Sequence, residues 1–271
     1  MSVGVAAGMI AGLFGMGGGV VVVPALIVVF DILDIDKNIA THLALGTSLA
    51  TVLVNTASAS RVHLKRKAIH KKVFLAMAPF VFVGSAIGSQ LAHFMSGYSL
   101  QLLCGLSAIL VALKMFLTKS ASKKQDSTQE KAYNSSPWTA HALSGLTIGC
   151  LSGMLGIGGG AISVPWLTLT GMPVPQAIAT ASGLGFTLAI AGTAGYTLAG
   201  SSLDLQIPYT LGYVYLPAFF GIISTSYIFA RIGAKLAHQT PVETLQKIFS
   251  IMLLFIGSKF IFSGLKGIAG L

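Results

Sequence analysis

A glycine-rich stretch that occurs twice most constrains what this chain can fold into. The first copy, Ala11 to Leu26, reads AGLFGMGGGVVVVPAL, and the second, Ser152 to Leu167, reads SGMLGIGGGAISVPWL. Both contain a GxGGG core, a Gly three residues before it and a Pro five residues after it, inside a long apolar run. Because glycine is flexible and packs no side chain, four glycines in five positions predict a break in a helix.

The composition places these predicted breaks in a membrane. Of the 271 residues, 54% are hydrophobic and only 9% are charged, whereas a soluble domain is about a quarter charged. Several apolar segments exceed the roughly 20 residues that span a bilayer. The expected segments cover residues 3–30, 38–60, 73–94, 98–117, 139–170, 176–200, 208–230 and 245–265. We therefore expect an all-α, multi-pass integral protein of the plasma (inner) membrane.

Further matches predict that the whole chain consists of two homologous repeats. Residues 39–41 and 178–180 both read Ile-Ala-Thr, and a Leu-Gly pair follows each at the same offset. Each repeat would contain four apolar segments in the same order. The predicted domains are an N-terminal membrane repeat over 1–117, a polar cytoplasmic linker over 118–138 and a C-terminal membrane repeat over 139–271. Such duplication is common in secondary transporters, where one half moves against the other.

The path of the glycine-broken segments decides whether the repeats are parallel or inverted. Residues 3–30 leave about 13 residues on each side of the break, so each arm reaches roughly 19 Å into a core about 30 Å thick. This length suits a re-entrant helix that returns to its starting side, which makes the repeats inverted. The inverted arrangement also puts Arg231 and Lys235 on the cytoplasmic side with the basic run at 61–72. A single crossing, with parallel repeats, is the alternative.

The paired GxGGG segments, each followed by Pro, resemble the TauE/SafE family of sulfite and organosulfur anion exporters. The resemblance covers nearly the whole chain. It implies a secondary transporter that exports small sulfur-containing anions such as sulfite, thiosulfate or organosulfonates. It also implies that the glycines of the two clusters bind the substrate, namely Gly15, Gly17, Gly18, Gly19, Gly156, Gly158, Gly159 and Gly160.

The chemistry of an opened glycine-rich backbone agrees with an anion as the ligand. Successive backbone N–H groups form a concave nest that binds anions. The half-helix that starts after each cluster directs the positive end of its dipole to the same place. Such a site at the membrane midplane needs no buried Lys or Arg. The alternative is that the glycines only allow close helix packing.

The second segment of each repeat contributes candidate polar side chains. Thr41 and Ser48 are seven residues apart and share a helix face, and Thr180 and Thr187 are their counterparts. Their hydroxyls, with that of Ser182, could donate hydrogen bonds to the anion. His42 could carry a proton or bind the anion, or it could lie solvated near the outer interface.

The sequence contains no pattern typical of an enzyme. The glycine clusters lack the Lys-Ser/Thr of a phosphate-binding loop, and no metal-ligand spacing or nucleophile–base pair is evident. We therefore expect no catalytic residue, cofactor or metal. The expected partners are the anion and the lipid bilayer, and no nucleic acid is expected. An anion channel, a non-transporting membrane subunit and an intramembrane enzyme are the alternative functions.

Overall fold

Helices form most of the described chain. The computed structural model describes residues 17–117, 138–203, 207–237 and 242–268. Gly15, most of the linker and the first part of segment 3–30 lie outside these ranges. The elements in chain order are α2 (Gly19–Ile32), α3 (Lys37–Lys65), α4 (Lys71–His93), α5 (Gly97–Leu117), α7 (Trp138–Leu155), α8 (Gly160–Leu169), α9 (Val174–Ser201), β1 (Thr210–Leu211), β2 (Val214–Tyr215), α10 (Leu216–Ala237) and α11 (Val242–Ile268).

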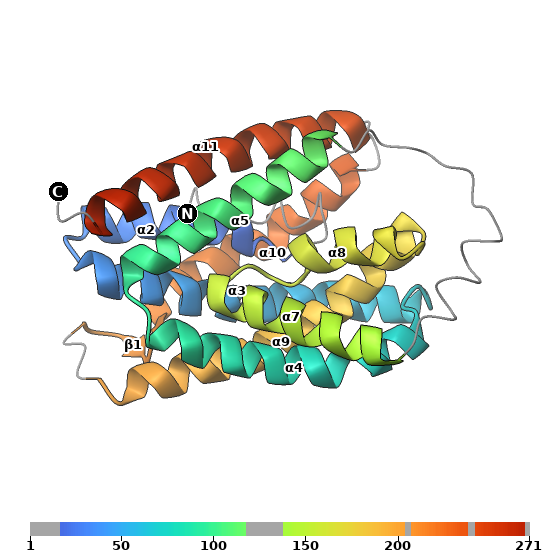
Figure 1. Ribbon diagram of the computed structural model, residues 1–271, viewed down its shortest axis with the longest axis horizontal. Helices are drawn as coiled ribbons and strands as arrows, with labels where there is room; N and C mark the ends of the chain where they lie inside the picture. The colour runs from blue at the N-terminus through green and yellow to red at the C-terminus, as the bar shows by residue number, and fades with distance from the viewer. Residues whose placement is uncertain (1–16, 118–137, 204–206, 238–241, 269–271) are drawn as a thin grey trace.

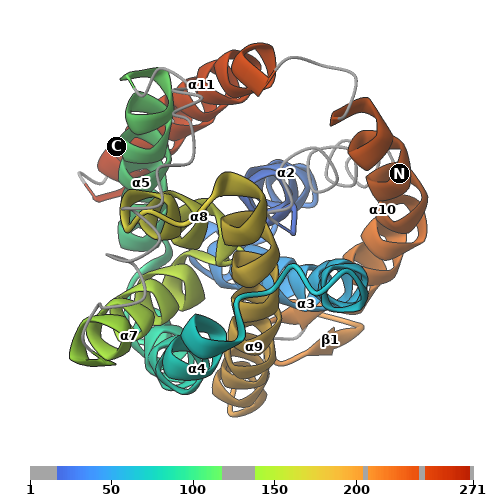
Figure 2. The same cartoon turned by 90° about the vertical axis from the view of Figure 1, so that its right-hand side faces the viewer.

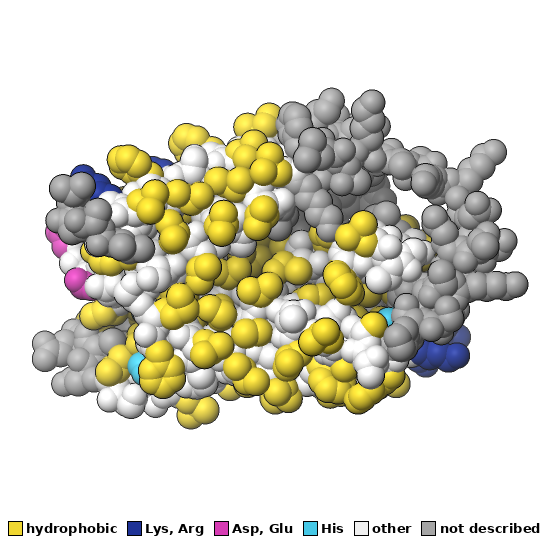
Figure 3. Space-filling view, in the orientation of Figure 1, with side chains coloured by type: hydrophobic (Ala, Val, Ile, Leu, Met, Phe, Trp, Pro, Cys, Tyr) yellow, Lys and Arg dark blue, Asp and Glu magenta, His cyan; other side chains and the backbone are white. Residues whose placement is uncertain are grey.

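The helices have the length and surface of a protein that crosses a membrane. Among the described residues, α3, α4 and Pro175–Ser201 within α9 are long and apolar enough to span a bilayer. Large apolar side chains such as Leu75, Phe94 and Phe255 are more than two-thirds exposed. Figure 3 shows apolar side chains over the middle of the molecule and charged ones towards its two ends. The chain is an integral multi-pass membrane protein, as expected.

The second glycine cluster interrupts a helix where the sequence predicts it. Helix α7 ends at Leu155, and α8 begins at Gly160. Gly156 has φ +63°, the left-handed conformation that commonly ends a helix. In Figure 1, α7 leads from the linker end of the molecule to its middle, and α8 leads back towards that end.

Parallel packing of α4 against α7 joins the two predicted repeats. A Cβ on Gly145 would lie 3.0 Å from the carbonyl oxygen of Met77, and one on Gly153 would lie 2.7 Å from that of Ser85. Glycines therefore allow the two backbones to touch, as small residues do between membrane helices. The glycines of this contact are Gly84, Gly88, Gly145, Gly149 and Gly153.

Two further helix pairs join the halves in antiparallel fashion. Gly192 of α9 lies against Leu49 of α3, whereas Gly185, earlier in α9, lies against Thr56, later in α3. Helices α5 and α11 also run in opposite directions, and they lie side by side in Figures 1 and 2. The helices that the predicted repeat pairs as counterparts, α3 with α9 and α5 with α11, are therefore packed on each other.

A short hairpin departs from the expected all-α architecture. The segment expected as a helix over 208–230 begins instead with the antiparallel strands β1 and β2, paired through Thr210–Tyr215 and Leu211–Val214. Gly212 turns the chain with φ +56°, and its position against the backbone of Thr197 leaves no room for a side chain. Thr47 of α3 accepts a hydrogen bond from the Tyr215 N–H at 2.9 Å, which fixes the hairpin to the end of the bundle.

Candidate functional site

The two glycine clusters meet beside the middle of the longest described helix, α3. A Cβ on Gly17 would lie 3.0 Å from Thr56 Cγ2 and 3.1 Å from Val52 Cγ1. A Cβ on Gly156 would lie 2.9 Å from Leu45 Cα. Because α3 covers Lys37–Lys65, these contacts put both breaks near the mid-depth of the bundle.

The breaks touch each other directly. A Cβ on Gly19 would lie 2.8 Å from the carbonyl oxygen of Gly156 and 2.9 Å from the amide nitrogen of Gly158. The Ser48 hydroxyl lies 2.8 Å from the Gly156 carbonyl oxygen, to which it donates, and 3.3 Å from that of Gly19. Ser48 therefore links the two broken segments, and Gly19 provides the room for their approach.

The local backbone differs between the two clusters. Gly17 and Gly18 have φ +71° and +80°, values that a side chain would make costly. In the second cluster Gly156 has such a φ, whereas Gly159 is right-handed at −49°. At Gly159 the only obstacle to a side chain is therefore space, since its Cβ would lie 3.3 Å from Leu188 Cδ1.

The N-terminus of α8 presents donors that no described group of the protein uses. Within the described residues, the N–H groups of Gly158, Gly159 and Gly160 donate to no protein group, and no side chain caps the helix. Ser163, one helical turn further on, is 0% exposed, and its hydroxyl has no partner. The Ser163 Oγ would lie 3.6 Å from a Cβ on Gly159, because helix side chains lean towards the N-terminus. A buried hydroxyl without a partner is costly, so this site favours a ligand.

The electrostatics at this point favour a negative charge. The N-termini of α2 and α8 meet here, and each carries about half a positive charge. The described buried residues include no Lys, Arg, Asp or Glu. Nothing in the described chain therefore neutralises the two helix ends, and an anion would do so.

Polar contacts also hold the first cluster. The Asn55 side-chain amide donates to the Gly17 carbonyl oxygen at 3.2 Å, and the Ser226 hydroxyl donates to Asn55 Oδ1, also at 3.2 Å. Helix α10 is thus connected to the break through α3. Asn55 and Ser226 support the backbone of the cluster.

The two expected threonines lie on opposite sides of the breaks and are hydrogen-bonded to other parts of the protein. The Thr41 hydroxyl, in the first turns of α3, donates to the Lys37 carbonyl and accepts from Gln101. Thr180 accepts a hydrogen bond from the N–H of His70, a residue beyond the other end of α3. They are separated by most of the length of α3, roughly 40 Å for 29 residues, so one small anion does not bind both.

The other expected side chains occupy three kinds of position. Thr187 donates to the Gly183 carbonyl of its own helix. Ser182, buried and without a partner, lies about one turn from Gly185, which borders Gly159. His42 is buried near the end of the bundle that carries the hairpin. The sequence interpretation missed Ser163, although a lone hydroxyl four residues after Gly159 in an apolar arm was an available signal.

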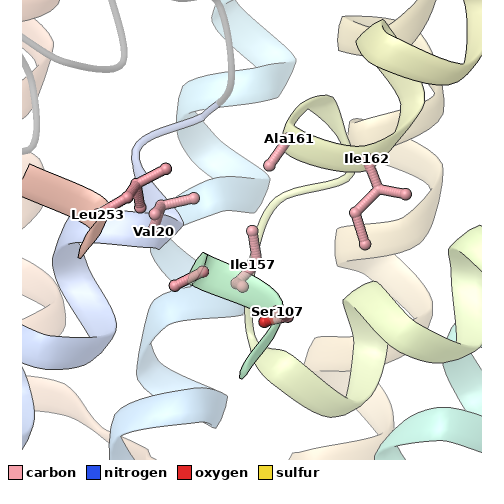
Figure 4. A pocket seen from close by; sticks show the side chains of 7 residues that line it. Val20, Ser107, Ile157, Ala161, Ile162 and Leu253 are labelled. Atoms are coloured by element: carbon pink, nitrogen blue, oxygen red, sulfur yellow. The ribbon is translucent and has the colours of Figure 1, made fainter. Parts of the chain in front are cut away.

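A small apolar cavity of about 20 Å³ lies beside the breaks. Figure 4 shows residues of its walls: Val20 after the first break and Leu253 of α11 on one side, and Ile157 and Ala161 at the second break on the other. A volume of this size accommodates about one water molecule. The donors of α8 are therefore not open to a wide channel on this side.

A helix that breaks at the centre of a helical membrane bundle, with the start of a second helix packed against the break, is typical of membrane transporters. The chain belongs to the sulfite exporter TauE/SafE family, whose model matches residues 1–260. It is 34% identical over 255 residues to a probable membrane transporter protein of Haemophilus influenzae, with 94% of both chains covered. It is 30% identical over 259 residues to the probable membrane transporter protein MJ0441 of Methanocaldococcus jannaschii, which covers 94% of this chain and 92% of that one. No solved structure matches.

Proposed function

We propose that this membrane transporter moves small sulfur-containing anions, such as sulfite, thiosulfate or organosulfonates, by a secondary mechanism. The observation that carries the proposal is the set of unused donors at the start of α8, the N–H groups of residues 158–160 and the hydroxyl of Ser163. These donors suit an oxyanion, because they bind its charge without a fixed counter-charge that would retain it. The approach of α2 adds the second helix dipole, and Ser48 holds the two breaks together.

The arrangement of the helices supports inverted repeats with re-entrant segments. A two-fold axis in the membrane plane makes counterpart helices antiparallel, whereas an axis along the membrane normal makes them parallel. The pairs α3–α9 and α5–α11 are antiparallel. Helix α8 joins α9 near the basic start of α4, as the Thr180–His70 contact indicates. Helix α7 starts at that same end, because it runs parallel to α4.

Topology can be tested with single cysteines in a background without Cys104 and Cys150. We expect Lys72→Cys and Thr170→Cys to resist an impermeant thiol reagent added to intact cells, because both positions lie at the basic, cytoplasmic end. Asp31→Cys, exposed at the other end, should react. Labelling of Thr170→Cys with protection of Lys72→Cys would instead favour parallel repeats, each crossing four times.

The substrate site can be tested by replacing Ser163 with alanine. A hydrogen bond to a charged group contributes about 1.5–3 kcal/mol, so we expect thiosulfate affinity to fall by about tenfold or more. Thermal stability should not fall, because the hydroxyl has no protein partner. The measurements are thiosulfate binding by calorimetry and the Tm of the purified protein.

Ser85→Ala is the matched control for this test. Ser85 is also buried on a membrane helix, but its hydroxyl donates to the Leu188 carbonyl at 2.8 Å. Its loss should lower stability by about 1 kcal/mol and leave thiosulfate affinity within a small factor. Unchanged affinity in Ser163→Ala would remove the start of α8 from the substrate site.

Liposome measurements distinguish a carrier from an anion channel. The small size of the cavity beside the breaks favours a carrier, in which helices must rearrange before the anion passes. A carrier predicts counterflow, in which unlabelled thiosulfate inside the liposomes accelerates uptake of labelled thiosulfate. Large unitary currents without counterflow would indicate a channel.

A further inference from the structure

His42 has an environment that suits the doubly protonated form of its side chain. The ring Nδ1 lies 2.7 Å from the carbonyl oxygen of Asn38, and Nε2 lies 3.0 Å from that of Ala92. Carbonyl oxygens only accept hydrogen bonds, and a neutral imidazole has only one N–H. Both contacts are hydrogen bonds only if the ring carries a proton on each nitrogen. The side chain is 5% exposed, so the ring is buried and its nitrogens face the two carbonyl oxygens rather than bulk water.

An aromatic contact completes the surroundings of the ring. The ring of Tyr213, in the turn of the hairpin, stacks on His42 with centroids 5.0 Å apart and planes at 27°. Stacking on the electron-rich face of an aromatic ring favours a cation. Burial raises the pKa of the Tyr213 hydroxyl, so this group stays neutral and adds no charge of its own.

The titratable neighbours of His42 among the described residues do not provide a negative partner. From α4 the nearest is His93, whose Nδ1 lies 3.2 Å from the Tyr213 hydroxyl. From the hairpin, the nearest titratable group is the Tyr213 hydroxyl. On the same helix, Lys37 is exposed, and Asp36 caps the helix by accepting from the Asn38 N–H. The two backbone carbonyls therefore bind the charge of the ring.

We propose that His42 is a proton-binding site that couples proton movement to anion transport. This inference rests on the proposed function. In the described conformation the protonated ring holds the end of α4 and the hairpin against α3. Ser48, six residues along α3 and about 9 Å away, links the two glycine breaks. When the proton leaves to water at this end of the bundle, one of the two hydrogen bonds is lost, and the contact between α3 and α4 weakens.

The protonation state can be measured without substrate. Nitrogen-15 NMR of labelled histidine in the full-length protein in lipid nanodiscs, at about pH 6, should show an imidazolium signal that His42→Gln removes. His63→Gln, at the other end of α3, should leave that signal in place. A variant in which only His42 remains of the six histidines identifies the signal if His42→Gln does not fold. A neutral ring with one N–H at this pH would overturn the proposal.

Coupling is measured in liposomes that contain a pH-sensitive dye and labelled thiosulfate, an anion whose charge is constant near neutral pH. We expect the wild-type protein and His63→Gln to move protons in a fixed ratio to thiosulfate. In His42→Gln the proton movement should fall to the leak of protein-free liposomes, whatever thiosulfate transport remains. An unchanged ratio would exclude His42 as the coupling site. Failure of the wild type to move thiosulfate would count against the proposed function, whereas the NMR result would still decide the protonation of His42.

Discussion

Gly159→Ala is expected to reduce thiosulfate transport by about 100-fold or more while the protein still folds. The new methyl group would lie at the start of α8, on the residue that carries one of the N–H donors, and 3.6 Å from Ser163 Oγ. An anion displaced from this position loses several charge-assisted hydrogen bonds, each of about 1.5–3 kcal/mol. The backbone accepts alanine, because Gly159 has φ −49° and its nearest neighbour is the flexible end of Leu188.

The control for this prediction is Gly221→Ala in α10. A Cβ on Gly221 would have no heavy atom within 4 Å, so this change tests only the effect of a methyl group on a membrane helix. Transport is measured as counterflow in liposomes, and folding as Tm and as the elution profile in detergent. A folded Gly159→Ala protein that transports at the wild-type rate would contradict the proposed site.

Gly149→Leu is expected to destabilise the folded protein strongly. The new side chain would meet backbone atoms of α4, with a Cβ 2.9 Å from Val81 Cα and 3.0 Å from the Ser85 nitrogen. Backbone cannot move aside as a side-chain tip can. Overpacking costs about 1–3 kcal/mol even where neighbours adjust, so we expect a fall in Tm of roughly 10 °C and a loss of the monodisperse fraction.

Gly221→Leu provides the corresponding control for bulk and hydrophobicity. It adds the same side chain to a membrane helix at an open position, and its Tm should remain within a few degrees of the wild type. Equal damage from both leucines would indicate a general intolerance of added bulk. In that case the close backbone contact between α4 and α7 would not explain the loss of stability.

The helices follow from the sequence because their apolar length is a local property. The expected segment 73–94 corresponds to α4, Lys71–His93, and the expected break corresponds to the gap between α7 and α8. The hairpin at Thr210–Tyr215 was missed. Its strands are only two residues long, and its position depends on a long-range contact with Thr47 of α3.

The candidate site was only partly predictable. Repeat matching made Thr41 and Thr180 equivalent, but the antiparallel packing of α3 and α9 places these two residues towards opposite ends of α3. Ser48, seven residues after Thr41, contacts the glycine breaks, whereas the Thr41 hydroxyl bonds to Lys37. Packing between the clusters determines which glycine adopts the left-handed conformation. The local sequence pattern does not contain this information. The unpartnered hydroxyl of Ser163 likewise depends on burial in the folded bundle.

The glycine contact between α4 and α7 bears on which parts of the protein can swing during a transport cycle. A rocking motion of the first half as one block would have to pull α4 away from α7, where the backbones touch. It would also have to part α3 from α9. We therefore expect the bodies that tilt against each other to be mixed in origin: a frame of α3, α4, α7 and α9, and an arm formed by α5 and α11. Severing the chain within the linker should leave both bodies intact, because neither is made from one half alone.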